Sequence, residues 1–237
     1  MKMIGKRLFF VLFVGVCFVS CGKQGQNPGD FKIEIQGTGK KTITITGYTG
    51  TEKDVRIPKK IGNIPVTEIG DSAFSLSELT SVTIPRSVTK IGKYAFFWNQ
   101  FTSVIIPKSV TQIGFNAFSW NQLASVTIPD SVIEIGQYAF YHNHLTSITI
   151  PRSIVGIRNS AFRDNKLTSV TIPNSVTFIE TYAFRDNPLT SVTIPDSVTF
   201  IGHCVFQGNQ LTTVTVPNSV TSLEADAFDD TVTIIRQ

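Results

Sequence analysis

The sequence predicts a β-rich solenoid, a fold in which each repeat makes one coil and successive coils stack on one another. Three series of residues recur every 22 positions along the chain. The first series consists of Phe74, Phe96, Phe118, Phe140, Phe162, Phe184, Phe206 and Phe228. The second consists of Pro85, Pro107, Pro129, Pro151, Pro173, Pro195 and Pro217, and the third of Leu79, Phe101, Leu123, Leu145, Leu167, Leu189 and Leu211. We therefore expect about eight stacked coils.

The first half of each repeat has the pattern of a half-buried strand. Val82 and Ile84 alternate with Ser81 and Thr83, and this two-residue period places apolar and polar side chains on opposite faces. Pro85 has no N–H to donate, so the strand is expected to end there.

The second half of each repeat is expected to turn the chain back toward the next coil. Val88 and Ile91 form a second short segment with inward-facing side chains, and Gly92 supports a turn. Phe96 and Asn99 lie in a tight turn or a single helical turn. One repeat alone has too little core to bury these side chains, so neighbouring coils must cover them at the strand spacing of about 4.8 Å.

The two ends of the stack differ from its middle, and we expect the following domain organisation. Residues 31–54 form an N-terminal β cap, a hairpin with its turn near Gly37–Gly39, and residues 55–237 form the solenoid. Residues 231–235 supply a closing strand, and the charge of Arg236 protects its exposed edge.

The first 20 residues have the pattern of an export signal. Basic residues precede an apolar run at positions 8–19, which is too short to span a bilayer as a helix. The run ends in Ser20-Cys21-Gly22, which resembles the bacterial lipobox, although Phe18 stands where Leu is usual. We expect lipidation of Cys21, and residues 21–30 as a flexible tether. An ordinary cleaved leader and an uncleaved anchor are the alternatives.

Composition limits the classes of partner and the stabilising chemistry. Removal of the leader takes Lys+Arg from 21 to 18 against 17 Asp+Glu, a net charge of about +1. A nearly neutral domain gives no electrostatic reason to expect nucleic acid as a partner. Cys204 is the one cysteine outside the leader and its cleavage site. Packing rather than an internal disulfide must therefore stabilise the fold.

The repeat resembles the BspA-like, or treponemal-type, leucine-rich repeats of bacterial surface proteins. The matching elements are Ile84-Pro85, Val88 to Gly92, Ala95-Phe96, and the opening unit from Ile64 to Phe74. The resemblance implies a curved, right-handed solenoid with a parallel sheet on its concave side. It also implies a surface or secreted protein that binds host matrix proteins, plasma proteins or other bacteria, with no catalytic site. Asn99 departs from the family, in which many members have a cysteine there.

Positions that stay constant between repeats are expected to serve the fold. The phenylalanines and the Leu79 series should point inward. An asparagine series could suggest a ladder of metal or sugar ligands, but we expect its side chains to bond turn backbone or to tolerate a left-handed conformation. The series consists of Asn99, Asn121, Asn143, Asn165, Asn187 and Asn209.

Positions that vary between repeats are better candidates for function. Stacking would align the two residues after each phenylalanine along one edge of the solenoid. The predicted ligand-binding residues on this edge are Phe97, Trp98, Trp120, Tyr141, His142, Arg163, Asp164 and Arg185. Asp186 continues the charged part of the edge. Aromatic residues beside arginines are typical of protein-binding hot spots. Alternatively, the rings cover the coil below them and the charged residues form a solvated ladder of little energetic value.

The outward residues of the strands offer a second surface. They form a nearly uniform array of serine and threonine, interrupted by Ile105. We expect the array to be structural, with its hydroxyl groups hydrated by water. The alternatives are a polar groove for an extended ligand and an ice-binding face. A concave sheet would fit a flat ice surface poorly.

No catalytic or metal-binding pattern stands out. His142 and His144 flank an asparagine without a third ligand at suitable spacing, and Cys204 beside His203 replaces the tyrosine of other repeats. We expect no enzyme activity, no cofactor and no metal. We expect an exported, lipid-anchored module at the cell surface or outer membrane that captures a macromolecule. A self-associating or periplasm-facing scaffold and a carbohydrate-binding protein are the alternatives.

Overall fold

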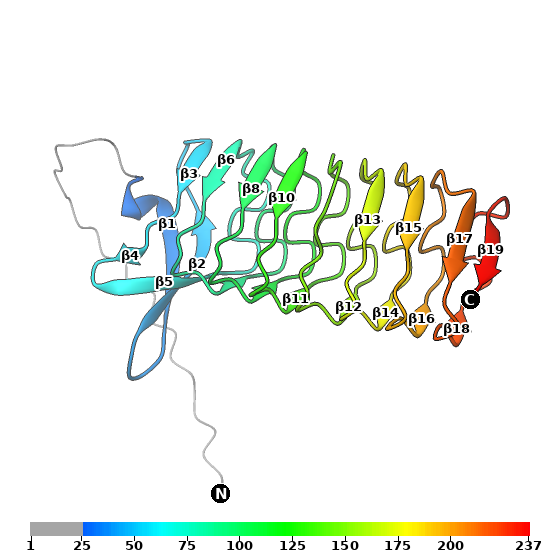
Figure 1. The fold of residues 1–237 in the computed structure, drawn as a ribbon. Helices are drawn as coiled ribbons and strands as arrows, with labels where there is room; N and C mark the ends of the chain where they lie inside the picture. Colours follow the sequence, from blue (N-terminus) through cyan, green and yellow to red (C-terminus); the bar gives the residue numbers. More distant parts are fainter. Residues whose placement is uncertain (1–25) are drawn as a thin grey trace, which may run out of the picture.

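Two ladders of short parallel strands run along the stack (Figure 1). The computed structural model describes residues 26–237. The predicted leader and lipidation site, Cys21, lie outside the described residues. The 22-residue coil, the parallel strands and the hairpin at the N-terminal end confirm the predicted fold class.

The first ladder contains the strands predicted around the Val82 series. Its members are β3 (Asp54–Arg56), β6 (Ser81–Thr83), β8 (Ser103–Ile105), β10 (Ser125–Thr127), β13 (Ser169–Thr171), β15 (Ser191–Thr193), β17 (Thr213–Val216) and β19 (Thr233–Arg236). Within the repeats the register is one repeat, so that Ser125 pairs with Ser103. The pairs at the two ends depart from it, since Asp54 pairs with Ser81 and Thr213 with Thr233. An isolated bridge from Thr149 to Thr171 continues the ladder where one repeat has no named strand.

The second ladder was not predicted as strand. It lies where the sequence analysis expected only a short inward-facing segment, and its members in the repeats have two residues each. They are β7 (Lys90–Ile91), β9 (Gln112–Ile113), β11 (Glu134–Ile135), β12 (Gly156–Ile157), β14 (Phe178–Ile179), β16 (Phe200–Ile201) and β18 (Ser222–Leu223). From β7 to β11 and from β12 to β18, successive members pair in parallel with a one-repeat register, as in Lys90 with Gln112, and no pairing joins β11 to β12.

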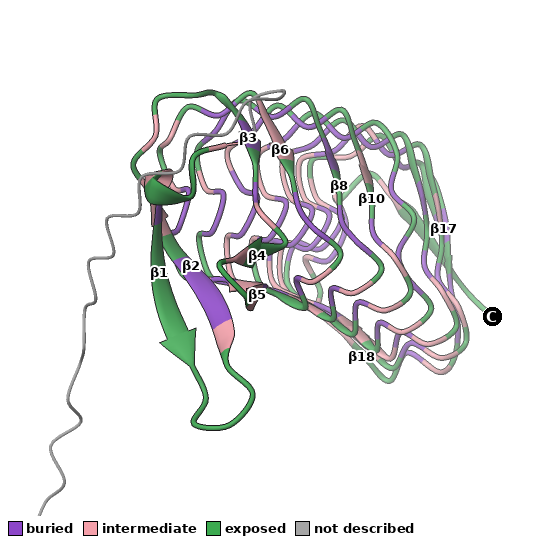
Figure 2. Ribbon diagram, turned by 90° about the vertical axis from the view of Figure 1, so that its left-hand side faces the viewer, coloured by how far each residue is buried: buried purple, intermediate pink, exposed green. Residues whose placement is uncertain are grey.

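The N-terminal hairpin extends the second ladder. After a short 3-10 helix, η1 (Pro28–Asp30), strands β1 (Phe31–Gln36) and β2 (Thr42–Tyr48) pair antiparallel. Strand β2 then pairs in parallel with β5 (Ile64–Ile69), which also pairs with β4 (Lys60–Ile61). Figure 2 shows the hairpin projecting from the end of the stack, with β1 largely exposed.

The phenylalanine series forms a continuous stack inside the solenoid. Adjacent rings have centroids 5.2 to 5.8 Å apart and planes within 16° of parallel. The exposed fraction of Phe228, at the C-terminal end, is 4 %, and that of the others is 1 % or less. Burial of each ring contributes about 1.5–3 kcal/mol before the entropy cost of folding. The predicted alignment of Phe96, Phe118 and Phe140 is confirmed.

The asparagine series serves the backbone, as expected. The Asn143 side chain donates from Nδ2 to the carbonyl oxygens of Phe118 (3.0 Å), Phe140 (3.2 Å) and Tyr141 (3.3 Å). Its Oδ1 accepts from the Leu123 N–H at 3.1 Å. One buried side chain therefore joins neighbouring coils, and it satisfies backbone groups that no strand pairs.

Candidate binding surface

The sequence-predicted edge residues lie together on the structure. The rings of Trp98 and Trp120 stack with centroids 4.9 Å apart and planes 15° from parallel. The ring of His142 lies 3.9 Å from that of Trp120, at 31°. We call Trp98, Trp120 and His142 the aromatic column. Phe97 and Tyr141 lie beside it, because their ring centroids are 6.0 Å from Trp98 and 5.9 Å from Trp120 respectively.

The backbone at the aromatic column is left-handed. The φ angles are 53° at Trp98, 57° at Trp120 and 52° at His142. The same position in the repeat has positive φ at Leu76, Asp164, Asp186 and Gly208, so the coil itself requires this conformation. Bulky residues adopt it at a cost of about 1–2 kcal/mol relative to their preferred conformations, whereas glycine adopts it freely. Tryptophan is therefore not the residue that this turn would favour on backbone grounds.

Stacking leaves only part of the column open to solvent. Trp98 is 50 % exposed, and Leu76, at the same position one coil earlier, is 64 % exposed. Trp120 and His142 are partly buried, because each has neighbours on both sides. The ring faces at the Trp98–Trp120 and Trp120–His142 contacts are therefore covered. The ring edges and the outer face of Trp98 remain available.

A second aromatic group continues the surface, and the sequence analysis predicted only two of its members, Phe97 and Tyr141. It consists of Tyr94, Phe97, Phe115, Tyr138 and Tyr141, with successive ring centroids 5.2 to 5.8 Å apart in edge-to-face contacts. The missed residues precede the core phenylalanine by two or three positions, where the repeat also varies. Attention to both sides of each phenylalanine would have found them.

The next coils replace the aromatic residues with charged ones that contact one another. Arg163 Nε lies 3.3 Å from Asp186 Oδ2, and Arg185 Nε lies 3.4 Å from the same oxygen. Both guanidinium groups also lie over the Tyr182 ring, 5.3 and 5.4 Å from its centroid. Asp164 contacts His142 Nδ1 and joins the charged coils to the column. The guanidinium groups of both arginines thus already contact neighbouring side chains.

A groove of about 390 Å³ runs beside the aromatic column. The aromatic column, the buried Asn99 and Asn121, and a set of polar residues line it. These polar residues are Glu78, Gln100, Gln122 and His144. The groove therefore combines ring edges with amide and carboxylate groups that can hydrogen-bond a ligand.

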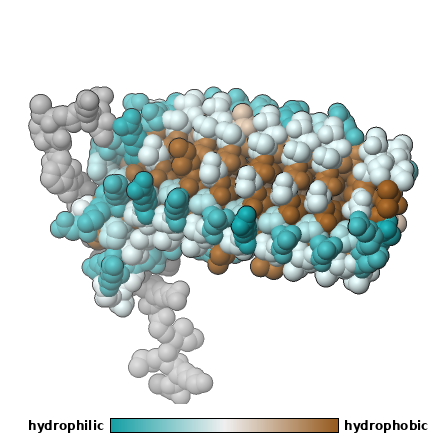
Figure 3. Space-filling view, viewed as in Figure 1, coloured by the Kyte–Doolittle hydropathy of each residue, from teal (hydrophilic) through white to brown (hydrophobic). Residues whose placement is uncertain are grey.

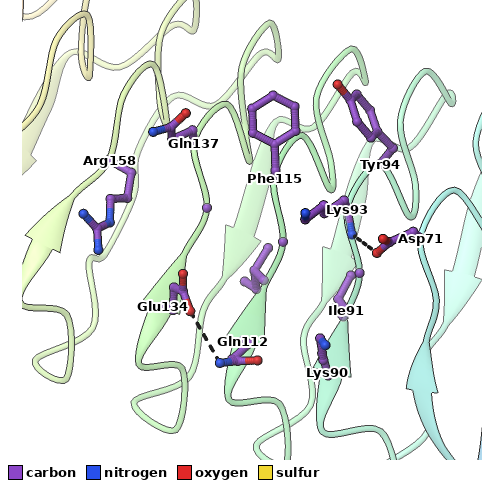
Figure 4. Close-up of a pocket in the computed structure, with 14 residues that line it drawn as sticks. Asp71, Lys90, Ile91, Lys93, Tyr94, Gln112, Phe115, Glu134, Gln137 and Arg158 are labelled. Carbon is purple, nitrogen blue, oxygen red and sulfur yellow. Dashed lines mark hydrogen bonds between the residues drawn. The ribbon is translucent and has the colours of Figure 1, made fainter. Parts of the chain in front are cut away.

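A larger groove of about 860 Å³ lies over the second ladder (Figure 4). Gly92, Gly114 and Gly136 line it, and a Cβ on Gly114 would lie 2.6 Å from the Gly92 backbone, so a side chain there would require the neighbouring backbone to shift. Figure 4 shows Tyr94 and Phe115 along one border. The charged side chains in it are of both signs: Asp71, Lys90, Lys93, Glu134 and Arg158.

Apolar residues also appear on the face that carries the first ladder. Figure 3 shows a hydrophobic band along the stack on this face. Ile105, which interrupts the hydroxyl array, is 78 % exposed. The array is thus less uniformly polar in space than its sequence pattern indicates.

The cluster around Cys204 is arranged to hold a protonated thiol. Its Sγ donates to Asp226 Oδ2 at 3.3 Å, while His203 Nδ1 contacts Asp226 Oδ1 at 2.9 Å. Burial, together with Asp226, raises the pKa of Cys204. Desolvation alone would raise the pKa of Asp226, but the hydrogen bonds from Cys204 and His203 lower it overall. His203 therefore contacts the carboxylate rather than the thiol that a nucleophile would require.

Residues 26–237 show neither the residue cluster of a metal site nor a membrane-spanning helix. Within this range, no cluster of three or more histidine, cysteine, aspartate or glutamate side chains has the arrangement of a metal site. The same residues include no helix with the length and apolar character needed to cross a membrane.

The repeat length, the two parallel ladders and the internal phenylalanine stack define a leucine-rich-repeat solenoid. The chain belongs to the family of BspA type leucine rich repeat regions, whose model matches residues 67–189 and 178–236 in six copies. No curated protein matches the sequence.

Solved structures share the fold. A leucine-rich repeat protein from Bacteroides ovatus is 20 % identical with a TM-score of 0.62, over 87 % of this chain and 66 % of that one. The chain therefore spans slightly less than two thirds of that protein's length. The T. pallidum leucine rich repeat protein is 28 % identical with a TM-score of 0.53, over 81 % of this chain and 85 % of that one.

Proposed function

We propose that the chain is a binding module of the bacterial cell surface that captures a macromolecule through its aromatic edge. The observation that carries the proposal is the aromatic column, in which Trp98 and Trp120 stack at turns whose backbone would favour glycine. Large aromatic side chains at exposed positions are typical of binding hot spots. Their retention at a conformationally costly position favours a role beyond the fold.

The geometry favours a protein ligand over a glycan. Sugar rings bind aromatic side chains face to face, but the faces of Trp120 are taken by Trp98 and His142. What remains is an apolar strip of ring edges and the outer face of Trp98, next to the exposed Leu76 and bordered by the amides of the adjacent groove. A protein surface can contact apolar edges and hydrogen-bond the amides at once.

Location at the surface is part of the proposal. Membership of the BspA-type family is compatible with it, and the sequence around Cys21 would supply a lipid anchor. Two or more acyl chains would hold the module on a membrane, whereas one would bind reversibly. Under this proposal the chain binds rather than catalyses.

A pull-down with residues 26–237 tests the proposal. The buried core cluster runs from Phe31 to Phe228, so this segment contains the described core and is expected to fold without the leader. We expect it to capture a protein from host matrix or plasma fractions, or intact cells of another bacterium. The triple variant Trp98→Ala, Trp120→Ala, Tyr141→Ala should lose capture and keep a cooperative thermal transition.

A matched variant on the first ladder serves as the control. Thr127→Ala, Thr149→Ala, Thr171→Ala alters exposed side chains of the hydroxyl array and should leave capture intact. Capture that survives the aromatic variant but fails in the threonine variant would place the site on the ladder instead. Binding to a glycan array by the unaltered segment, with no protein captured, would favour the carbohydrate alternative.

A further inference from the structure

The C-terminal end of the stack has an exposed strand with an open edge. Strand β19 pairs only with β17, and all four of its residues are exposed. The N–H groups of Thr233 and Gln237 bond toward β17, at 2.9 Å to Thr212 and 3.3 Å to Val216. Because backbone groups alternate along a strand, those of Ile234 point away from the stack. Such an edge is a template for pairing with another chain.

The N-terminal end has a matching strand. Among the described residues, 26–237, strand β1 pairs only with β2, and of its own residues Phe31 alone is buried. Ile33 and Ile35 are 38 % and 48 % exposed, comparable with 41 % for Ile234 and 49 % for Ile235 at the other end. Each end therefore presents an exposed strand with two partly exposed isoleucines.

The two ends carry opposite charge. Residues 26–63 contain seven Lys or Arg against four Asp or Glu, a net of +3, and residues 218–237 contain one Arg against four Asp or Glu, a net of −3. All seven basic side chains of the N-terminal end are exposed. They are Lys32, Lys40, Lys41, Lys53, Arg56, Lys59 and Lys60.

Charge decides between the possible end contacts. Two N-terminal ends would bring positive groups together, and two C-terminal ends would bring negative groups together; both contacts are repulsive. We propose that a second copy of this chain docks head to tail, with β19 of one copy against β1 of the next. This contact uses two different surfaces, so each docked copy offers a free end to another, and an open filament forms.

The contact rests on independent observations and does not require the proposed capture function. Exposed ion pairs contribute little individually, so the isoleucines and the strand edges must supply most of the affinity, while charge selects the orientation. Long-range attraction between exposed charges is screened by salt over about 10 Å at 0.1 M ionic strength. Assembly should therefore weaken as salt increases.

Sedimentation velocity of residues 26–237 tests the proposal with a charge exchange. The tail variant Asp230→Lys, Thr231→Lys, Thr233→Lys changes the net charge of residues 218–237 from −3 to +1. The head variant Lys59→Glu, Lys60→Glu changes that of residues 26–63 from +3 to −1, and all five altered side chains are exposed. The unaltered chain should form oligomers whose mass grows with concentration beyond two copies and falls with salt. Each variant alone should remain monomeric, because its two ends then carry charge of the same sign. A mixture of the two should associate again, because the unaltered ends of the two variants attract each other and so do the two reversed ends.

Restored association in the mixture is the result that supports complementary ends. Three outcomes would overturn the proposal: a chain that stays monomeric at every concentration, an assembly that stops at two copies, or association that both variants retain. Each variant should also show the same thermal transition as the unaltered chain. Loss of assembly can then be assigned to the altered charge at the ends rather than to unfolding.

Discussion

The edge that follows the core phenylalanines is aromatic in one half of the stack and charged in the next, on the same backbone. Trp98 and Trp120 occupy the position that Asp164 and Asp186 occupy further along, and φ at the four residues lies between 53° and 58°. The aromatic half leaves Trp98 half exposed. In the charged half, the edge arginines lie near Asp186 and the Tyr182 ring.

The comparison separates what the fold requires from what it permits. Beneath both halves lie the same phenylalanine stack and the same asparagine ladder. The edge side chains therefore change without a change in the interior. A ligand would find unsatisfied apolar surface in the aromatic half, whereas in the charged half it would have to displace existing partners.

The largest expected effect tests whether the interior is the same under both halves. Asn143→Ala and Asn187→Ala should each destabilise the fold by about 3 kcal/mol, because each leaves buried backbone groups without a partner. Asn187 donates to Phe162 and Phe184 at 3.0 and 3.1 Å, as Asn143 does to its own neighbours. Chemical denaturation measures both. Unequal losses would contradict the common interior, and the exposed Gln122→Ala serves as the control.

A smaller effect distinguishes the two halves at the edge itself. Trp120→Ala should destabilise the fold by about 1–2 kcal/mol, since it removes contacts with the rings of Trp98, Tyr141 and His142. Alanine keeps a Cβ, so the substitution does not relieve the backbone strain. Arg185→Ala should cost under about 1 kcal/mol, because its ion pair is partly exposed and screened. Chemical denaturation at low and high salt distinguishes the two variants. Only the loss of unfolding free energy caused by Arg185→Ala should become smaller as salt increases. A salt-sensitive tryptophan effect would argue against the assignment.

The smallest effect concerns Cys204, which stands where Tyr94 and Tyr138 stand in the aromatic half. Because burial and Asp226 raise the thiol pKa, the thiolate forms at higher pH than in an unfolded chain. Alkylation near pH 8 should therefore be slower in the folded protein than in denaturant, and Asp226→Asn should speed it. Equal rates in both states would mean that the thiol is not held as described.

The sequence predicts the repeated features of this fold better than the variable ones. Spacing alone placed Phe96, Phe118 and Phe140 in the interior, because a period that recurs in every coil leaves few other packings. The second ladder escaped prediction because two-residue strands such as Lys90–Ile91 have no alternation to detect. The mutual stacking of Trp98 and Trp120 depends on side-chain rotamers, which the sequence pattern does not specify.

The hairpin was predicted more completely than its role. Alternating residues and the turn near Gly37–Gly39 indicated β1 and β2, but not that β2 would pair with β5 and extend the second ladder. The opposite charge of the two ends was present in the sequence. The sequence did not show that these charged segments contain β1 and β19, two strands with open edges at opposite ends of the stack.

Circular dichroism of the two tryptophans tests the in-register stack most directly. The chain has only two tryptophans, 22 residues apart, and the structure stacks their rings at 4.9 Å. At this distance the transition dipoles of the two indole rings should couple. The circular dichroism spectrum should then contain a positive band paired with a negative band. Trp98→Phe and Trp120→Phe should each abolish the pair while preserving the thermal transition. A spectrum equal to the sum of the two single-tryptophan variants would contradict the stack.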